Sequence, residues 1–171
     1  MHDFAKLVEE QIPRLRRYAV ALVRSNRSSA DDLVQDTLER AIAKQHLWQP
    51  GTNLRAWLFT IMHNQYVNTV RRVARDGNAV DIEDFHNSLA SPNDTSGSAQ
   101  MRELERCIAQ LPTEQRQVIL LIGLEGMSYE EVAQIMVVPV GTVRSRLSRG
   151  RDHLRRLMGM IDDEAATRRA A

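Results

Sequence analysis

The sequence predicts an all-α fold made of two small helical domains joined by an acidic, flexible linker. Apolar residues recur at helical spacing through most of the 171 residues. No stretch of useful length alternates apolar and polar residues, as a half-buried strand would. Residues 76–99 lose the helical period and gather Gly, Pro, Asn, Ser and acidic residues, a composition typical of a linker. The expected domains are therefore residues 1–75 and 100–160, and residues 161–171 form a tail.

The N-terminal half predicts three helices. Apolar positions at helical spacing run through residues 3–24, and a second amphipathic segment follows, with Ser29 and Asp31 as plausible caps. A break at Pro50 and the glycine after it separates this pair from a third helix over residues 53–73. The third helix is apolar in its first half and turns polar in its second half.

The C-terminal half predicts further helices that end in a helix-turn-helix. Ser128 and Glu131 have the spacing of a capping box, and Met127 can pack on Val132 as a hydrophobic staple. The short helix that they begin is broken at residues 137–139, and a new helix starts near residue 141. Two helices joined by so short a turn are typical of DNA-binding proteins, in which the second helix enters the major groove.

The last helix has one apolar and one basic face. At about 100° per residue, one stripe gathers apolar residues and glycine, and the other side gathers arginine and serine. The stripe consists of Val143, Leu147, Gly150, Leu154 and Leu157, and the opposite face of Arg144, Ser145, Ser148 and Arg149. Residues 141–156 hold six arginines against one acid. This imbalance favours DNA binding over a merely solvated face, which would carry both signs.

Composition excludes several classes of protein. The formal net charge is only +1, but residues 1–75 carry 12 basic against 7 acidic side chains, whereas residues 76–100 carry 0 against 5. The longest apolar stretch, residues 118–124, is far shorter than a membrane span, so we expect a cytoplasmic protein without membrane insertion. Cys107 is the single cysteine and the five histidines lack metal-ligand spacing, so we expect no disulfide, metal or cofactor.

Several motifs in a fixed order resemble the extracytoplasmic-function (group 4) sigma factors of bacterial RNA polymerase. They are ADDLVQDTLERA, NLRAWLFTIMHN, LPTEQRQVILL, SYEEVAQIM and PVGTVRSRLSRGR, and they cover nearly the whole chain apart from the linker and tail. The resemblance implies an N-terminal domain, sigma region 2, that binds core polymerase and opens the −10 element. It implies a C-terminal domain, sigma region 4, that reads the −35 element as duplex. Such a protein directs transcription initiation and has no catalytic activity of its own.

The resemblance also assigns roles to residues. Residues at the motif that grips the clamp helices of the largest polymerase subunit are Asp32, Gln35, Asp36 and Arg40. Residues near the −10 strand are Trp48, Asn64 and Asn68, with Arg71, Arg72 and Arg75 on backbone phosphate. The −35 readers are Arg144, Ser145, Ser148 and Arg149. Taken without the resemblance, the first set is the polar face of an amphipathic helix, Trp57 is a core residue, and Trp48 is equally compatible with either role.

Partners and regulation follow from the same resemblance. The implied partners are core polymerase, through its clamp helices and the flap of its second-largest subunit, promoter DNA and an anti-sigma factor. The segment QPGTNLRAWLFTI resembles the alphaproteobacterial general-stress branch. In that branch an anti-sigma protein covers the polymerase-binding surface until a response regulator that mimics sigma removes it. This chain shows no receiver domain, so it resembles the sigma factor and not the mimic.

The chain departs from the family pattern at two positions of the C-terminal domain. Many relatives carry Gly where this chain has Val137, and a β-branched residue resists positive φ, so we expect another turn conformation here. Gly150 replaces a common Ala, and inside a helix it should cost about 0.5–1 kcal/mol of stability.

Two other classes of function are compatible with parts of the sequence. A free-standing helix-turn-helix repressor or activator would bind an operator without polymerase and would need a dimerisation surface. An enzyme could use His63 beside Asn64, or His153 beside Asp152, as acid–base groups. No nucleophile, metal cluster or phosphate loop accompanies these histidines, which favours a structural role for them.

Overall fold

The computed structural model describes residues 2–24, 26–76 and 98–170, and the side chains of residues 4–24, 26–76 and 98–159. The predicted linker, residues 76–99, lies outside the described residues except at its two ends. Every regular element of the described residues is helical, which confirms the all-α prediction. The elements are α1 (His2–Leu22), α2 (Arg27–Ala43), η1 (Gln45–Leu47), α3 (Leu54–Arg75), α5 (Ala99–Gln110), α6 (Thr113–Ile119), a π-helical turn η2 (Leu120–Leu124), α7 (Tyr129–Met136) and α8 (Val140–Ala170).

Asparagine side chains begin the two helices that later frame the site. Asn26 Oδ1 accepts a hydrogen bond from the backbone N–H of Ser29 at 3.0 Å and thereby caps α2. The expected caps at Ser29 and Asp31 were therefore wrong, because the asparagine three residues earlier already satisfies the first free N–H groups. Asn53 caps α3 in the same way through the backbone N–H of Ala56, also at 3.0 Å.

The turn of the helix-turn-helix keeps the left-handed conformation in spite of its valine. Val137 has φ 54° and ψ 53°, and its side chain is 82% exposed. The backbone N–H of Val138 returns to the carbonyl of Ala133 at 3.1 Å, the bond that closes a left-handed helix end. The expectation of another turn conformation was wrong. The buried faces of α7 and α8 fix the angle between these helices, and Val137 adopts the backbone conformation that this angle requires.

Gly150 allows α8 to approach α6 closely. A Cβ atom at this position would lie 2.8 Å from Ile119 Cδ1 and 3.3 Å from Gln115 Cβ. The predicted loss of helix stability is therefore offset by close packing. The same face of α8 buries Val143 and Leu147, as the apolar stripe predicted.

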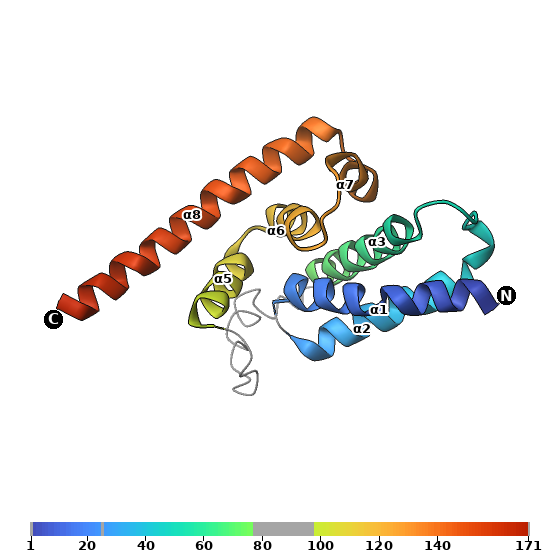
Figure 1. Cartoon of the computed structure of the whole chain (residues 1–171), viewed down its shortest axis with the longest axis horizontal. Helices are drawn as coiled ribbons and strands as arrows, with labels where there is room; N and C mark the ends of the chain where they lie inside the picture. The colour runs from blue at the N-terminus through green and yellow to red at the C-terminus, as the bar shows by residue number, and fades with distance from the viewer. Residues whose placement is uncertain (1, 25, 77–97, 171) are drawn as a thin grey trace.

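Both halves of the chain contribute to one hydrophobic core. Figure 1 shows α1, α2 and α3 side by side, α8 along the opposite edge of the molecule, and α5, α6 and α7 between them. A single cluster of buried residues joins Leu15, Leu58 and Met62 of the first half to Leu121 and Ile135 of the second. Helix α3 packs on α7, and α1 packs on α5 and η2. The two domains predicted from the sequence are thus in direct contact.

Buried polar groups lie where the halves meet. Arg116 of α6 is 1% exposed, and its guanidinium donates to the carbonyls of Leu22, at the end of α1, and of Leu111, at 2.9 and 2.7 Å. Burial lowers the pKa of Arg116, and the neighbouring charge of Arg24 lowers it further. Burial also raises the pKa of the Tyr18 hydroxyl. Burying such groups costs desolvation free energy unless all their hydrogen bonds are satisfied. The contact between the two halves therefore includes an unfavourable desolvation contribution.

A second set of polar contacts surrounds Glu125 and Glu131. The exposed Arg17 donates to the buried Glu125 carboxylate from Nε at 3.1 Å and from Nη2 at 3.0 Å. Glu131 completes the predicted capping box with Ser128 and also accepts from Asn53 Nδ2 at 2.6 Å. These hydrogen bonds lower the pKa of Glu131, and the one from the Ser128 backbone has the largest effect. One carboxylate thus joins the starts of α7 and α3.

Candidate nucleic-acid interface

The last helix presents the face that the sequence predicted. Arg144, Ser148 and Arg149 are exposed and Ser145 is half-buried, whereas the apolar stripe is turned inward. Arg149 donates from Nη2 to Ser145 Oγ at 3.2 Å, and Ser145 donates to the carbonyl of Thr142 at 3.1 Å. These contacts hold Arg149 along the helix surface before any ligand binds. Arginine and serine in this arrangement can contact base edges and phosphates in a major groove.

The structure adds two residues to this part of the surface that were not predicted from the sequence. The Arg144 guanidinium lies 5.9 Å from the ring centroid of Tyr129 at the start of α7, within range of a cation–π contact. Arg146 has a side chain only 19% exposed and pairs with Glu114 of α6 at 3.1 Å. Arg146 therefore fastens α8 to α6, and it lies between the half-buried Ser145 and the buried Leu147. Tyr129 belongs to the SYEEVAQIM motif, and no pattern in the sequence distinguishes it or Arg146 as part of this surface.

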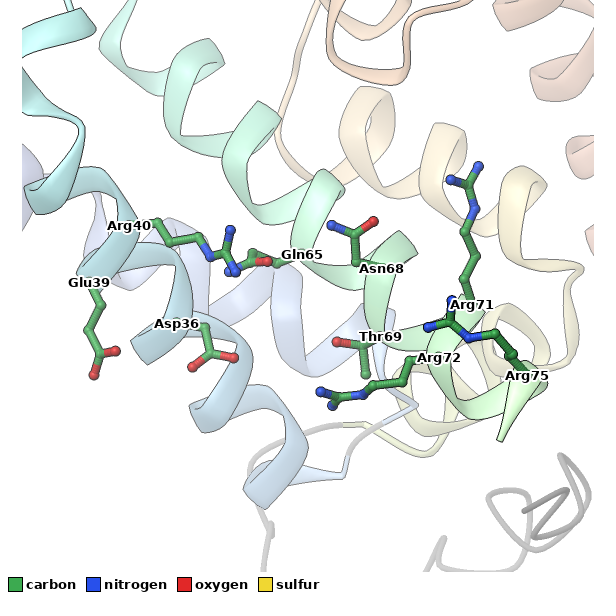
Figure 2. Close-up of a pocket in the computed structure, with 9 residues that line it drawn as sticks. All are labelled: Asp36, Glu39, Arg40, Gln65, Asn68, Thr69, Arg71, Arg72 and Arg75. Atoms are coloured by element: carbon green, nitrogen blue, oxygen red, sulfur yellow. The ribbon is translucent and has the colours of Figure 1, made fainter. Parts of the chain in front are cut away.

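A polar groove lies between α2 and α3, as Figure 2 shows. It has a volume of about 610 Å³, and nine residues line it. Helix α2 contributes Asp36, Glu39 and Arg40, and α3 contributes Gln65, Asn68, Thr69, Arg71, Arg72 and Arg75. Four arginines stand against two carboxylates, so the groove favours an anionic ligand.

The groove brings together residues that the sequence assigned to two different partners. Asp36 and Arg40 were expected to contact polymerase, whereas Asn68, Arg71 and Arg72 were expected to contact the −10 strand. The exposed Arg75, expected on phosphate, lines the groove beside them.

The other predicted residues of the first domain lie outside the groove. Asp32 and Gln35 are exposed on α2, and Gln35 Nε2 donates to Glu39 Oε1 at 3.0 Å. Asn64 is exposed on α3, one turn before Asn68. The half-buried Trp48 follows η1, and its ring lies 5.4 Å from that of Phe4.

The two histidines considered for acid–base chemistry, His63 and His153, are both partly buried on helices. His63 Nδ1 lies 3.3 Å from Gln117 Nε2, a contact between α3 and α6. Burial lowers the pKa of His63, and the nearby Arg146 lowers it further. His153 is half-buried on α8. In the part of the chain that the structure describes, no cluster of side chains could hold a metal ion, and no helix is long and apolar enough to cross a membrane.

Two family profiles match the two halves. The Sigma2 domain of PhyR matches residues 8–63, and sigma-70 region 4 matches residues 101–154. The EcfG sigma factor of Rhodopseudomonas palustris is 38% identical over 147 residues, which cover 86% of this chain and 80% of that protein.

Two solved structures resemble the whole fold. The sigma factor RpoE of Bartonella quintana, solved with the anti-sigma factor NepR, has a TM-score of 0.81 at 38% identity, covering 93% of this chain and 98% of that one. CnrH, solved with the cytosolic domain of CnrY, has a TM-score of 0.66 at 26% identity, covering 92% and 88%.

The matched regions 2 and 4 define a sigma factor, an initiation factor of RNA polymerase. The chain belongs to the extracytoplasmic-function RNA polymerase sigma factors and is of the alphaproteobacterial general-stress type. This confirms the family resemblance seen in the motifs.

Proposed function

We propose that this chain is a dissociable, cytoplasmic specificity subunit without catalytic activity, which recruits core polymerase to promoters that it reads at two places. Residues 1–75 act as region 2, residues 100–160 as region 4, residues 76–99 as the linker and residues 161–171 as a tail. The observation that carries the proposal is the exposed basic face of α8 on a helix-turn-helix, in a chain whose other half presents a second basic surface in the groove. Phosphate contacts from both surfaces supply affinity, and base contacts supply specificity.

The residues divide among three contacts. Arg144, Ser145, Ser148 and Arg149 read the −35 element, and Trp48, Asn64, Asn68, Arg71 and Arg72 contact the −10 strand. The exposed surface of α2, with Asp32, Gln35, Asp36 and Arg40, binds the clamp helices of the largest polymerase subunit. Region 4 meets the flap of the second-largest subunit.

Both promoter elements can be read together only after the halves separate. The −35 and −10 positions are about 25 base pairs apart, which corresponds to about 85 Å along the duplex at about 3.4 Å per base pair. In the closed arrangement α7 packs directly on α3, and the pKa of His63 responds to Arg146 of the recognition helix. The incompletely paired charges of Arg116 and Glu125 regain water on separation, which makes opening less costly than for a purely apolar contact.

An anti-sigma factor is the proposed regulator, in a stress response. The Bartonella quintana sigma factor was solved in complex with the anti-sigma factor NepR, and its fold covers nearly all of this chain. We expect a comparable small protein to bind this chain and block polymerase.

Two charge-altering variants test the division of roles. Arg149→Ala should lower transcription from a matched promoter and relax the preference at one −35 base, while core affinity stays unchanged. Asp36→Arg should weaken core association, while the basic face of α8 keeps its affinity for duplex DNA. Equal loss of core binding in both variants would count against the assignment.

A further inference from the structure

The two arginines on the basic face of α8 are held in different ways. Arg149 donates from Nη2 to Ser145 Oγ at 3.2 Å, a contact within α8 itself. Arg144 instead places its guanidinium over the ring of Tyr129, the first residue of α7, at 5.9 Å from the ring centroid. Arg144 and Tyr129 belong to different helices, so only the folded helix-turn-helix brings them together.

The Tyr129 ring is a fixed support. The capping box holds the backbone around it, because the backbone N–H of Glu131 donates to Ser128 Oγ at 3.1 Å and that of Ser128 donates to Glu131 Oε2 at 2.8 Å. The ring is half-buried and packs against the hydrophobic core. At the other end of α7, the backbone N–H of Val138 donates to the carbonyl of Ala133 and closes the turn into α8. Main-chain hydrogen bonds and core packing thus set the position of the ring relative to α8.

An aromatic ring supports a reading arginine better than a carboxylate does. Arg146, on the same helix, shows the alternative, since its guanidinium pairs with Glu114 at 3.1 Å. A carboxylate occupies N–H donors and neutralises the charge that attracts DNA. A ring face attracts the cation but leaves the N–H groups free, because they lie in the plane of the guanidinium. Among the described residues no carboxylate pairs with Arg144, so its donors remain available for the two acceptors of a guanine edge.

We propose that Tyr129 is a positioning residue for −35 recognition, whose ring holds the Arg144 guanidinium ready to read one base of the duplex. The inference rests on the proposed function and deepens it, because it adds a residue of α7 to the four −35 readers of α8. A free arginine side chain has many rotamers, and holding it near one of them lowers the entropy cost of binding. A cation–π contact at an exposed site corresponds to about a two- to fivefold change in affinity.

The test uses holoenzyme assembled from the full chain and core polymerase, with promoter fragments from upstream of this protein's own gene in which the −35 element is randomised. Sequencing the bound fragments gives the base preference at each −35 position, and Arg144→Ala identifies the position that Arg144 reads. Tyr129→Leu should reduce the preference at that position about two- to fivefold. The position that depends on Arg149 is the internal control and should keep its wild-type preference, because Ser145 holds Arg149 without the ring.

Two further variants separate the ring from the hydroxyl and from the fold. Tyr129→Phe keeps the ring and should retain the wild-type preference, whereas a loss equal to that of Tyr129→Leu would show that the hydroxyl acts on DNA directly and would overturn the inference. Adding Tyr129→Leu to Arg144→Ala should change promoter affinity by less than about 1.5-fold, because the guanidinium that the ring holds is already gone. Effects that multiply, or a uniform loss of preference at all −35 positions in Tyr129→Leu, would also overturn it.

The wild-type holoenzyme separates this inference from the function on which it rests. If the wild-type holoenzyme selects −35 sequences and the Tyr129→Leu holoenzyme selects the same ones equally strongly, only the role of Tyr129 fails. If the wild-type holoenzyme selects no −35 sequence, the proposed function fails and the inference fails with it.

Discussion

Replacing Val137 with glycine should stabilise the protein, although it removes a whole side chain from the turn. A β-branched residue held at φ 54° is strained by about 2–3 kcal/mol, at the upper end of the range for such outliers. Glycine removes that strain but loses about 0.5–1 kcal/mol more chain entropy on folding. The side chain is 82% exposed, so the lost burial is worth only about 0.3–0.5 kcal/mol.

The balance is a gain of about 1 kcal/mol, which for a chain of this size raises the melting temperature by about 2–4 °C. Circular dichroism at 222 nm during heating, with urea unfolding as a second measure, would detect it. Val138→Gly is the matched control, because Val138 is half-buried and lacks a positive φ, so this change should destabilise. A Val137→Gly variant that melts as low as the Val138→Gly variant would refute the claim that the turn is strained.

Two further predictions concern the contacts of α8 and α3. Gly150→Ala should raise the melting temperature by less than its better helix propensity, about 0.5–1 kcal/mol, allows, because the new Cβ would lie 2.8 Å from Ile119 Cδ1 and 3.3 Å from Gln115 Cβ. Adding Ile119→Val, which deletes Cδ1, should remove the first of these contacts and restore part of the gain. Additive effects of the two changes would argue against the collision. The pKa of His63 is lowered from its ordinary value of 6.5 in the folded chain. As the pH falls below about 6.5, the unfolded chain therefore binds a proton before the folded chain does. The free energy of unfolding consequently decreases below that pH. His63→Gln should therefore reduce the drop in melting temperature between pH 7.5 and pH 5.5, and an unchanged drop would exclude His63 as its source.

Local signals in the sequence were sufficient for most helices. The capping box at Ser128 and the apolar stripe through Val143 and Leu147 are both present as predicted. Each depends on residues within one or two helical turns, where spacing alone determines which side chains meet. The cap of α2 was misplaced by a few residues for the same reason, since Asn26 and Ser29 are both good caps and only the backbone conformation chooses between them.

Features that depend on distant contacts could not be predicted. Arg116 reads as a surface charge in its own helix and is buried only because the end of α1 offers the carbonyl of Leu22. Val137 violates local preference because packing of α7 on α8 sets the turn. The groove joins Arg40 and Gln65, which are 25 positions apart, and no short-range pattern connects a buried amide to an arginine on another helix.

The measurement that tests the central claim most directly is run-off transcription with purified core polymerase. Templates would carry the region upstream of this protein's own gene, and reactions would be compared with and without the chain. The account predicts promoter-specific transcripts that appear only when the chain is added. Absence of such transcripts, together with a shift of duplex DNA by the chain without core, would contradict it and favour a free-standing helix-turn-helix regulator.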